Sequence, residues 1–133
     1  MMEEGVLVTC NGCFDGLHGG HLFFLGFCRG QGGRLIVGIN TDKYIISKKR
    51  PNPTNEEQRR EDLLKLGFIE KVDIFPESNP SEFIIRNRPG IHCIGEEYKD
   101  TAAELPTCRD LGIKVVYVPR IGTWSTTALK GKK

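Results

Sequence analysis

Five short apolar runs, separated by segments that can form helices, most constrain the fold of this chain. The runs cover residues 6–10, 35–39, 72–75, 91–94 and 114–118. Because these runs are mostly apolar and do not alternate regularly with polar residues, they predict strands buried on both faces. Strands of this kind that alternate with helices form a parallel sheet covered by helices on both faces. Right-handed crossovers then predict a doubly wound α/β domain with a five-stranded parallel sheet.

The segments between the runs carry helix signals. We expect helices over residues 21–28, 55–66, 80–87 and 101–111, and a short last helix from Thr126. Thr54 and Glu57 fit a capping box before the second of these helices, and Gly67 ends it. Pro80 opens the third helix in its first turn, and Pro106 interrupts or restarts the fourth.

Length and composition predict one domain and argue against several classes of protein. With 133 residues, 38% apolar and 27% charged, the chain is expected to form a single domain over residues 1–133. Its net charge is +2 and its basic residues are scattered, which does not indicate a nucleic-acid groove. No stretch is long and apolar enough to cross a membrane, and the start lacks a signal-peptide pattern. The five cysteines have no secretory context, so we expect reduced thiols and a cytoplasmic protein.

The loop after the first predicted strand has the pattern of a phosphate-binding site. His18 and His21 lie three positions apart at the start of a helix, among glycines that let the backbone approach a ligand. A helix N-terminus presents N–H groups and the positive end of its dipole to an anion. Both imidazoles can therefore donate hydrogen bonds to phosphoryl oxygens as charge shifts in a transition state.

This loop resembles the H-x-G-H signature of the cytidylyltransferase-like superfamily of nucleotidyltransferases. Seven residue types over ten positions match it, namely Gly12, Phe14, Asp15, Leu17, His18, Gly20 and His21. The resemblance implies a Rossmann-like domain in which the two histidines are catalytic. It also implies a set of residues that bind the nucleotide from this loop, which are Gly12, Cys13, Phe14, Asp15 and Gly20.

Two further loops extend the resemblance. Lys48 stands where the family has a catalytic lysine that reaches the triphosphate, and Asp42 and Arg59 match positions that bind the acceptor or the triphosphate. After the fourth predicted strand, Gly95, Glu97 and Tyr98 match a loop that lies against the nucleotide, with Glu97 in place of the usual aspartate.

A last loop resembles the second signature of the family, and the resemblance then spans residues 6 to about 129. Arg120 is implied as a further catalytic residue, and a serine at a helix N-cap with two threonines would hold the phosphates of the nucleotide. These residues are Ser125, Thr126 and Thr127. Gly122 is shifted by one position, and Trp124 replaces a smaller residue. These departures, with that at Glu97, leave open a protein that senses a nucleotide without turning it over.

The resemblance implies transfer of a nucleoside monophosphate from ATP or CTP to a small phosphorylated acceptor, with release of pyrophosphate. Mg²⁺ is implied as the companion of the triphosphate, although the sequence shows no carboxylate cage for a metal. Residues 11–15, 38–40, 50–53 and 98–99 resemble heptose-phosphate adenylyltransferases. The Arg120 signature, the spacing from Asp42 to Arg59 and the compact size resemble glycerol-3-phosphate cytidylyltransferases. We favour the heptose-phosphate enzymes because their resemblance covers more positions.

Two other features have alternative interpretations. Cys10 and Cys13, followed by His18 and His21, resemble a four-ligand zinc set, but Cys10 is expected in a buried strand and core packing is favoured for both cysteines. The apolar residues 22–27 indicate either a homodimer contact or burial against the sheet.

Overall fold

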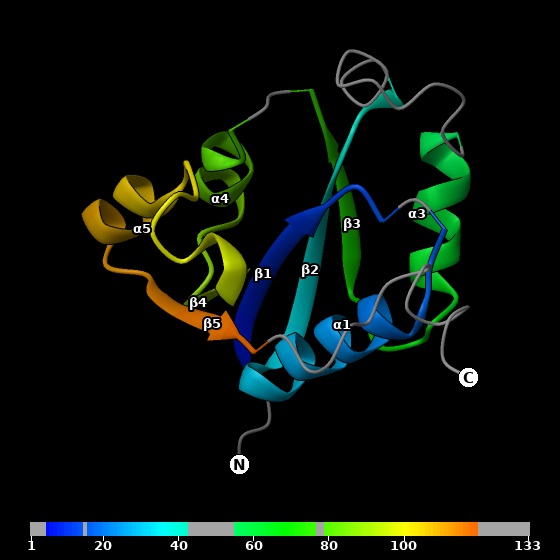
Figure 1. Cartoon of the computed structure of the whole chain (residues 1–133), viewed down its shortest axis with the longest axis horizontal. Coiled ribbons are helices and arrows are strands. Elements are labelled where there is room, and N and C mark those ends of the chain that lie inside the picture. Colours follow the sequence, from blue (N-terminus) through cyan, green and yellow to red (C-terminus); the bar gives the residue numbers. More distant parts are fainter. Residues whose placement is uncertain (1–4, 15, 43–54, 77–78, 120–133) are drawn as a thin grey trace.

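A five-stranded, all-parallel sheet forms the centre of the computed structural model, which describes residues 5–14, 16–42, 55–76 and 79–119 (Figure 1). The strands are β1 (Val6–Gly12), β2 (Gly33–Asn40), β3 (Lys71–Phe75), β4 (Ile91–Gly95) and β5 (Lys114–Val118). All pair in parallel, in the order β3-β2-β1-β4-β5. Each predicted strand is found, and β1 and β2 extend beyond the apolar runs that predict them.

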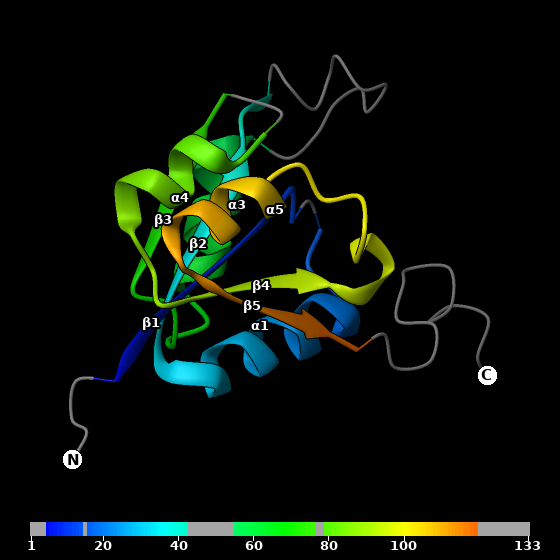
Figure 2. The ribbon, with the colours of Figure 1, turned by 90° about the vertical axis from the view of Figure 1, so that its left-hand side faces the viewer.

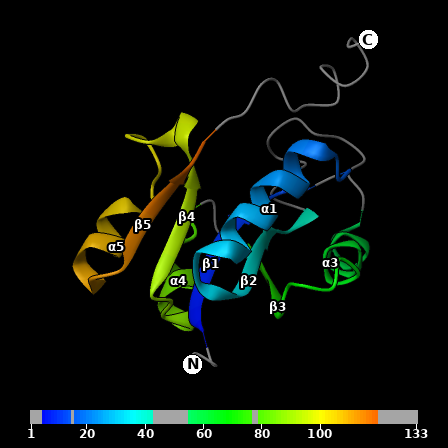
Figure 3. The same ribbon diagram turned by 90° about the horizontal axis from the view of Figure 1, so that it is seen from below.

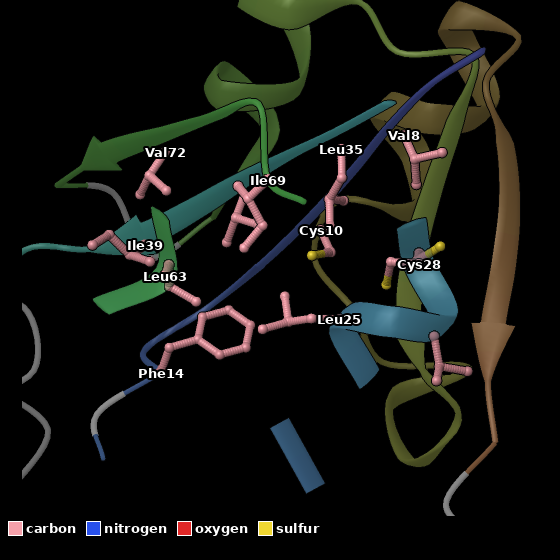
Figure 4. Close-up of a cluster of buried hydrophobic side chains, with 13 residues drawn as sticks. Val8, Cys10, Phe14, Leu25, Cys28, Leu35, Ile39, Leu63, Ile69 and Val72 are labelled. Carbon is pink, nitrogen blue, oxygen red and sulfur yellow. The ribbon is translucent and has the colours of Figure 1, made fainter. Parts of the chain in front are cut away.

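Helices cover both faces of the sheet, as the sequence predicts. They are α1 (Gly19–Gly32), α3 (Glu56–Leu64), α4 (Ser81–Asn87) and α5 (Leu105–Leu111). α1 and α3 lie on one face, where Leu25 and Leu63 join the larger core cluster (Figures 3 and 4). α4 and α5 lie on the other face, where Phe83 and Cys108 join the second cluster; β4 and β5 run between α1 and these two helices (Figure 2). None of the described helices has the length and apolar character to cross a membrane.

Three helices begin at residues other than those predicted, because their caps differ. α1 begins at Gly19, since the ring of His18 accepts the N–H of Gly20 and caps the helix. α3 is capped by Asn55, not by Thr54; the Asn55 side chain accepts the N–H groups of residues 57 and 58 at 2.8 and 3.2 Å. Pro80 is the N-cap of α4 and precedes its first turn.

The predicted helix over residues 101–111 is shorter than expected. α5 begins at Leu105 with Pro106 in its first turn, where its missing N–H is not needed. A short 3-10 helix, η1 (Glu96–Tyr98), directly follows β4. The helix predicted from Thr126 lies outside the described residues.

The order of the strands reverses between β1 and β4. β2 and β3 lie on one side of β1, and β4 and β5 lie on the other. Open parallel sheets bind ligands beyond the carboxyl ends of the strands at such a reversal. The loop that follows Gly12 and the segment that follows Gly95 meet at this edge of the sheet.

Candidate active site

Two stacked histidines form the start of α1. The N–H of Gly20 donates to Nδ1 of His18 at 3.0 Å, and the N–H of His18 donates to Nδ1 of His21 at 3.2 Å. The ring centroids are 3.9 Å apart with an interplanar angle of 25°. Because Nδ1 of each ring accepts a hydrogen bond, the neutral rings carry their proton on Nε2. The capping box therefore offers two Nε2–H donors at a helix N-terminus.

His21 is held in its neutral form by its surroundings. Burial, and secondarily the nearby His18, lower the pKa of His21 from 6.5 to about 4. The ring of Phe14 packs edge-on against His21, with centroids 5.3 Å apart and an interplanar angle of 63°. Phe14 is itself a core residue with a positive φ of 51°, and Figure 4 shows it beside Leu25. The predicted nucleotide-binding residue Phe14 thus uses its side chain to support a histidine.

A pocket of about 290 Å³ opens beside the two histidines. The start of α1 and its N-cap line it with His18, Gly20, His21, Phe23 and Phe24. The end of β4 and the segment after it contribute Gly95, Glu97 and Tyr98, and the end of β5 contributes Val118 and Pro119. Six of the predicted site residues therefore come together from two distant parts of the chain. One wall offers imidazole N–H groups for an anion, and the aromatic and apolar walls offer surfaces for a flat ring.

Glu97 folds back over Gly95 within this pocket. A Cβ placed on Gly95 would lie 2.8 Å from Oε1 of Glu97, so a glycine allows the close approach of this carboxylate. Gly12 has a similar role on β1, because a Cβ there would lie 3.0 Å from the ring of Phe14. Tyr98 is 56% exposed at the pocket rim and can contact a bound ligand.

Arg59 and Asp42 tie the loop after β1 to the start of α3. The guanidinium of Arg59 is 1% exposed and donates to the carbonyl of Cys13 at 2.9 Å and to Oδ1 of Asp42 at 2.8 Å. Oδ2 of Asp42 accepts the N–H of Glu56, whose carboxylate accepts the N–H of Asp42. In this structure Arg59 and Asp42 thus bind protein groups, and their contact with a phosphate stays a prediction.

The remaining predicted residues are placed as follows. The thiol of Cys13 donates to Oδ1 of Asn40 at 3.6 Å. Several residues lie outside the part of the chain that the structure describes, namely Asp15, Lys48, Arg120, Gly122, Trp124, Ser125, Thr126 and Thr127. Two of the four predicted catalytic residues, His18 and His21, are therefore described.

The structure bears on two alternatives, a zinc site at Cys10 and Cys13 and the role of the apolar residues 22–27. Cys10 is buried in the larger core cluster, and no three His, Cys, Asp or Glu side chains converge to hold a metal ion among the described residues. Of the apolar residues 22–27, Leu25 is fully buried and two phenylalanines line the pocket, so this stretch is used for the core and the site. The use of Phe23 and Phe24 as pocket walls was not predicted.

A buried polar group of residues near the reversal of strand order was not predicted. Thr9, His92 and Glu104 are 0, 0 and 5% exposed and are hydrogen-bonded to one another. A histidine inside a predicted buried strand is a signal for such a group, because a buried polar side chain requires a partner.

Several known proteins have sequences similar to that of this chain. The sequence model of the cytidylyltransferase-like family matches residues 9–123. A D-beta-D-heptose 1-phosphate adenylyltransferase of Bordetella bronchiseptica is 38% identical over 95% of this chain and 80% of its own length. A bifunctional protein HldE of Pseudomonas fluorescens is 36% identical over 98% of this chain, which spans 28% of that protein.

A solved structure has the same fold as this chain. The lipopolysaccharide core biosynthesis protein from Thermoplasma volcanium superposes with a TM-score of 0.73 and 25% identity, over 91% of this chain and 99% of that one. The family match covers most of the chain and includes the paired histidines, the pocket-lining segment after β4 and the end of β5. The chain therefore belongs to the cytidylyltransferase-like family and is a nucleotidyltransferase.

Proposed function

We propose that this chain transfers an adenylyl group from ATP to a heptose phosphate and releases pyrophosphate. The observation that carries the chemistry is the His18–His21 pair, which presents two Nε2–H donors beside the pocket. The choice of nucleotide and acceptor is supported by the relative from Bordetella bronchiseptica, named a heptose 1-phosphate adenylyltransferase. We propose only the adenylyl transfer that this name states, because this chain spans only 28% of the bifunctional relative from Pseudomonas fluorescens.

The reaction needs alignment and charge stabilisation more than a strong base. An oxygen of the acceptor phosphate, already an anion near neutral pH, attacks the α-phosphorus of ATP in line with the departing group. The bond from the α-phosphorus to the bridging oxygen breaks, and pyrophosphate leaves with that electron pair. His18 and His21 donate from Nε2 to the α-phosphoryl oxygens, where charge shifts in the transition state. With its pKa lowered to about 4, His21 acts as a neutral donor.

The pocket suggests how the nucleotide lies. The triphosphate would extend from the histidines, and the nucleoside would lie against the aromatic and apolar walls near Phe24 and Tyr98. The carboxylate of Glu97 can accept a hydrogen bond from a ribose hydroxyl or a base amino group.

Residues outside the described part would hold the rest of the nucleotide. By their match to the family, Lys48 and Arg120 would bind the β- and γ-phosphates, together with Ser125, Thr126 and Thr127. By the same match, Asp42 and Arg59 would bind the acceptor phosphate or the triphosphate. Mg²⁺ would enter with ATP, held mostly by phosphate oxygens and water, and would neutralise triphosphate charge.

Cytoplasmic location and a homodimer are part of the same proposal. The four buried cysteines, Cys10, Cys28, Cys93 and Cys108, are thiols, which suits a reducing compartment. Leu22 remains 46% exposed on α1 and is the residue of the apolar stretch most open to a second copy. Light scattering of the purified protein measures the oligomeric state.

The deciding experiment measures pyrophosphate release in the presence of Mg²⁺. ATP and CTP are each combined with heptose 1-phosphate, glycerol 3-phosphate and ribitol 5-phosphate, and His18→Asn is the matched control. Turnover with ATP and heptose 1-phosphate, lost in His18→Asn, supports the proposal. Turnover with CTP and glycerol 3-phosphate would replace it by a cytidylyltransferase, and nucleotide binding without turnover on any acceptor would favour a nucleotide sensor.

A further inference from the structure

A buried hydrogen-bonded network joins β1, β4 and the start of α5, and none of its residues lines the pocket. Oγ1 of Thr9 on β1 is 2.8 Å from Nδ1 of His92 on β4, and Nε2 of His92 is 2.9 Å from Oε2 of Glu104. Glu104 is the N-cap residue of α5. Thr9 and His92 are also paired across the strands at the reversal of strand order. The network therefore connects the centre of the sheet with the start of a helix.

Glu104 ends the segment that carries one wall of the pocket. Residues 96–103 leave β4 and return to α5, and all of them except Ala102 are exposed (Figure 2). Hydrogen bonds within the segment shape it: the N–H of Lys99 donates to the carbonyl of Glu96, and the N–H of Ala102 to that of Tyr98, both at 3.1 Å. Buried residues lie at its two ends, in β4 and at Glu104.

The two hydrogen bonds of His92 hold Glu104, the residue at which this segment ends, against β4. Both ring nitrogens are engaged, so the ring cannot rotate without breaking one of the two bonds. Loss of either partner would leave a buried donor or acceptor unsatisfied, which costs more than the bond itself stabilises. The carboxylate of Glu104 is thus fixed relative to β4, twelve residues before it in the sequence.

We propose that His92 and Glu104 are positioning residues for the nucleotide pocket. They fix the return of residues 96–103 to the body of the domain, and so place Glu97 and Tyr98 against the bound nucleotide. This inference rests on the proposed function in taking a nucleotide as the ligand of the pocket. Neither residue contacts the ligand, so their loss weakens nucleotide binding and leaves the chemistry at His18 and His21 intact.

Two substitutions of His92 test its hydrogen bonds to Thr9 and to Glu104 separately. His92→Asn places an amide near the position of Nδ1, which keeps the contact with Thr9 and removes that with Glu104. His92→Gln places its amide near the position of Nε2 and keeps the contact with Glu104. Thr107→Val is the matched control, because it removes a different hydroxyl contact of α5, 2.7 Å long, to Ser81. All three are first checked for folding by thermal denaturation.

The first measurement is calorimetric titration with Mg·ATP, accompanied by steady-state kinetics. For His92→Asn, Kd and KM for ATP should rise about tenfold, the equivalent of one lost buried hydrogen bond, with kcat within about twofold of wild type. His92→Gln should restore binding, and Thr107→Val should leave it unchanged. A folded His92→Asn protein that binds ATP as the wild type does would overturn the inference, as would an equal loss in Thr107→Val.

The second measurement does not depend on the nucleotide. Backbone amides of residues 98–103 should exchange hydrogen faster in His92→Asn and in Glu104→Leu than in the wild type, but not in Thr107→Val. Glu104→Leu replaces His92→Asn if the latter does not fold. Unchanged exchange in the folded variants would contradict the positioning role. If the wild type binds neither ATP nor CTP, the proposed function fails, and the exchange data still test the role of the network.

Discussion

The imidazole rings of His18 and His21 stack at 3.9 Å, and Nδ1 of His21 accepts the N–H of His18. Nδ1 of His18 in turn accepts the N–H of Gly20. The same two rings therefore cap α1 and present their Nε2–H groups to the pocket. Under the proposed function, different nitrogens of one side chain carry the structural and the catalytic task, so a mutation can separate the two.

His18→Asn should separate these tasks. Asparagine is a good N-cap residue, and its Oδ1 can accept the N–H of Gly20, but it has no counterpart of Nε2. We expect kcat to fall about 10²- to 10³-fold with little change in the midpoint of thermal unfolding. His18→Ala should lose the same activity and also about 1 kcal/mol of stability. A His18→Asn enzyme with wild-type kcat would exclude the catalytic role.

The stability of the protein should fall as the pH drops from about 6.5 to about 4. The pKa of His21 is about 4 in the folded state and 6.5 when unperturbed, so the unfolded state binds more protons in this range. The pKa of Glu70, lowered by its hydrogen bond to Arg34, adds a loss of the same sign only below its usual 4.5. Urea denaturation across this range measures the slope, and His21→Asn should flatten it. A slope unchanged by His21→Asn would show that other groups cause it.

Arg59→Ala should be far more destabilising than Arg60→Ala. Removing the buried Arg59 leaves Asp42, which is 33% exposed, and the carbonyl of Cys13 without this donor, at a cost of about 2–4 kcal/mol. Arg60 is on the same helix, and its side chain is 43% exposed in a pair with Glu57, worth at most about 0.5 kcal/mol. Urea denaturation of both variants provides the comparison. Equal losses of stability in the two variants would mean that the hydrogen bonds of Arg59 to Cys13 and Asp42 contribute little to the free energy of unfolding.

Gly38→Ala should destabilise the sheet. The rings of Phe75 and Phe83 stack 5.7 Å apart over β2, and a Cβ on Gly38 would lie 3.0 and 2.9 Å from them. Overpacking of this kind costs about 1–3 kcal/mol. Gly26→Ala is the contrast, because a Cβ there meets no described atom within 4 Å, and alanine should stabilise α1 by up to about 1 kcal/mol. Thermal denaturation should shift the two midpoints in opposite directions.

Local sequence patterns were enough to predict the strands, the approximate positions of the helices and the first site loop. Every apolar run is a strand, and β5 has the predicted bounds. A strand buried on both faces has apolar residues at consecutive positions, so it can be recognised from a short stretch of sequence. The paired histidines were recognised for a similar reason, since spacing along one loop and one helix turn is local information.

Contacts between groups that are distant in the sequence became known only from the folded chain. The strand order brings the segment with Glu97 and Tyr98 to the histidines, because β4 pairs with β1 although the two strands are far apart in the sequence. Arg59 was predicted to bind phosphate or acceptor, and the fold places its guanidinium against the Cys13 carbonyl and Asp42. Such pairings depend on free energies of burial and hydrogen bonding between elements, and the residue types alone do not encode them.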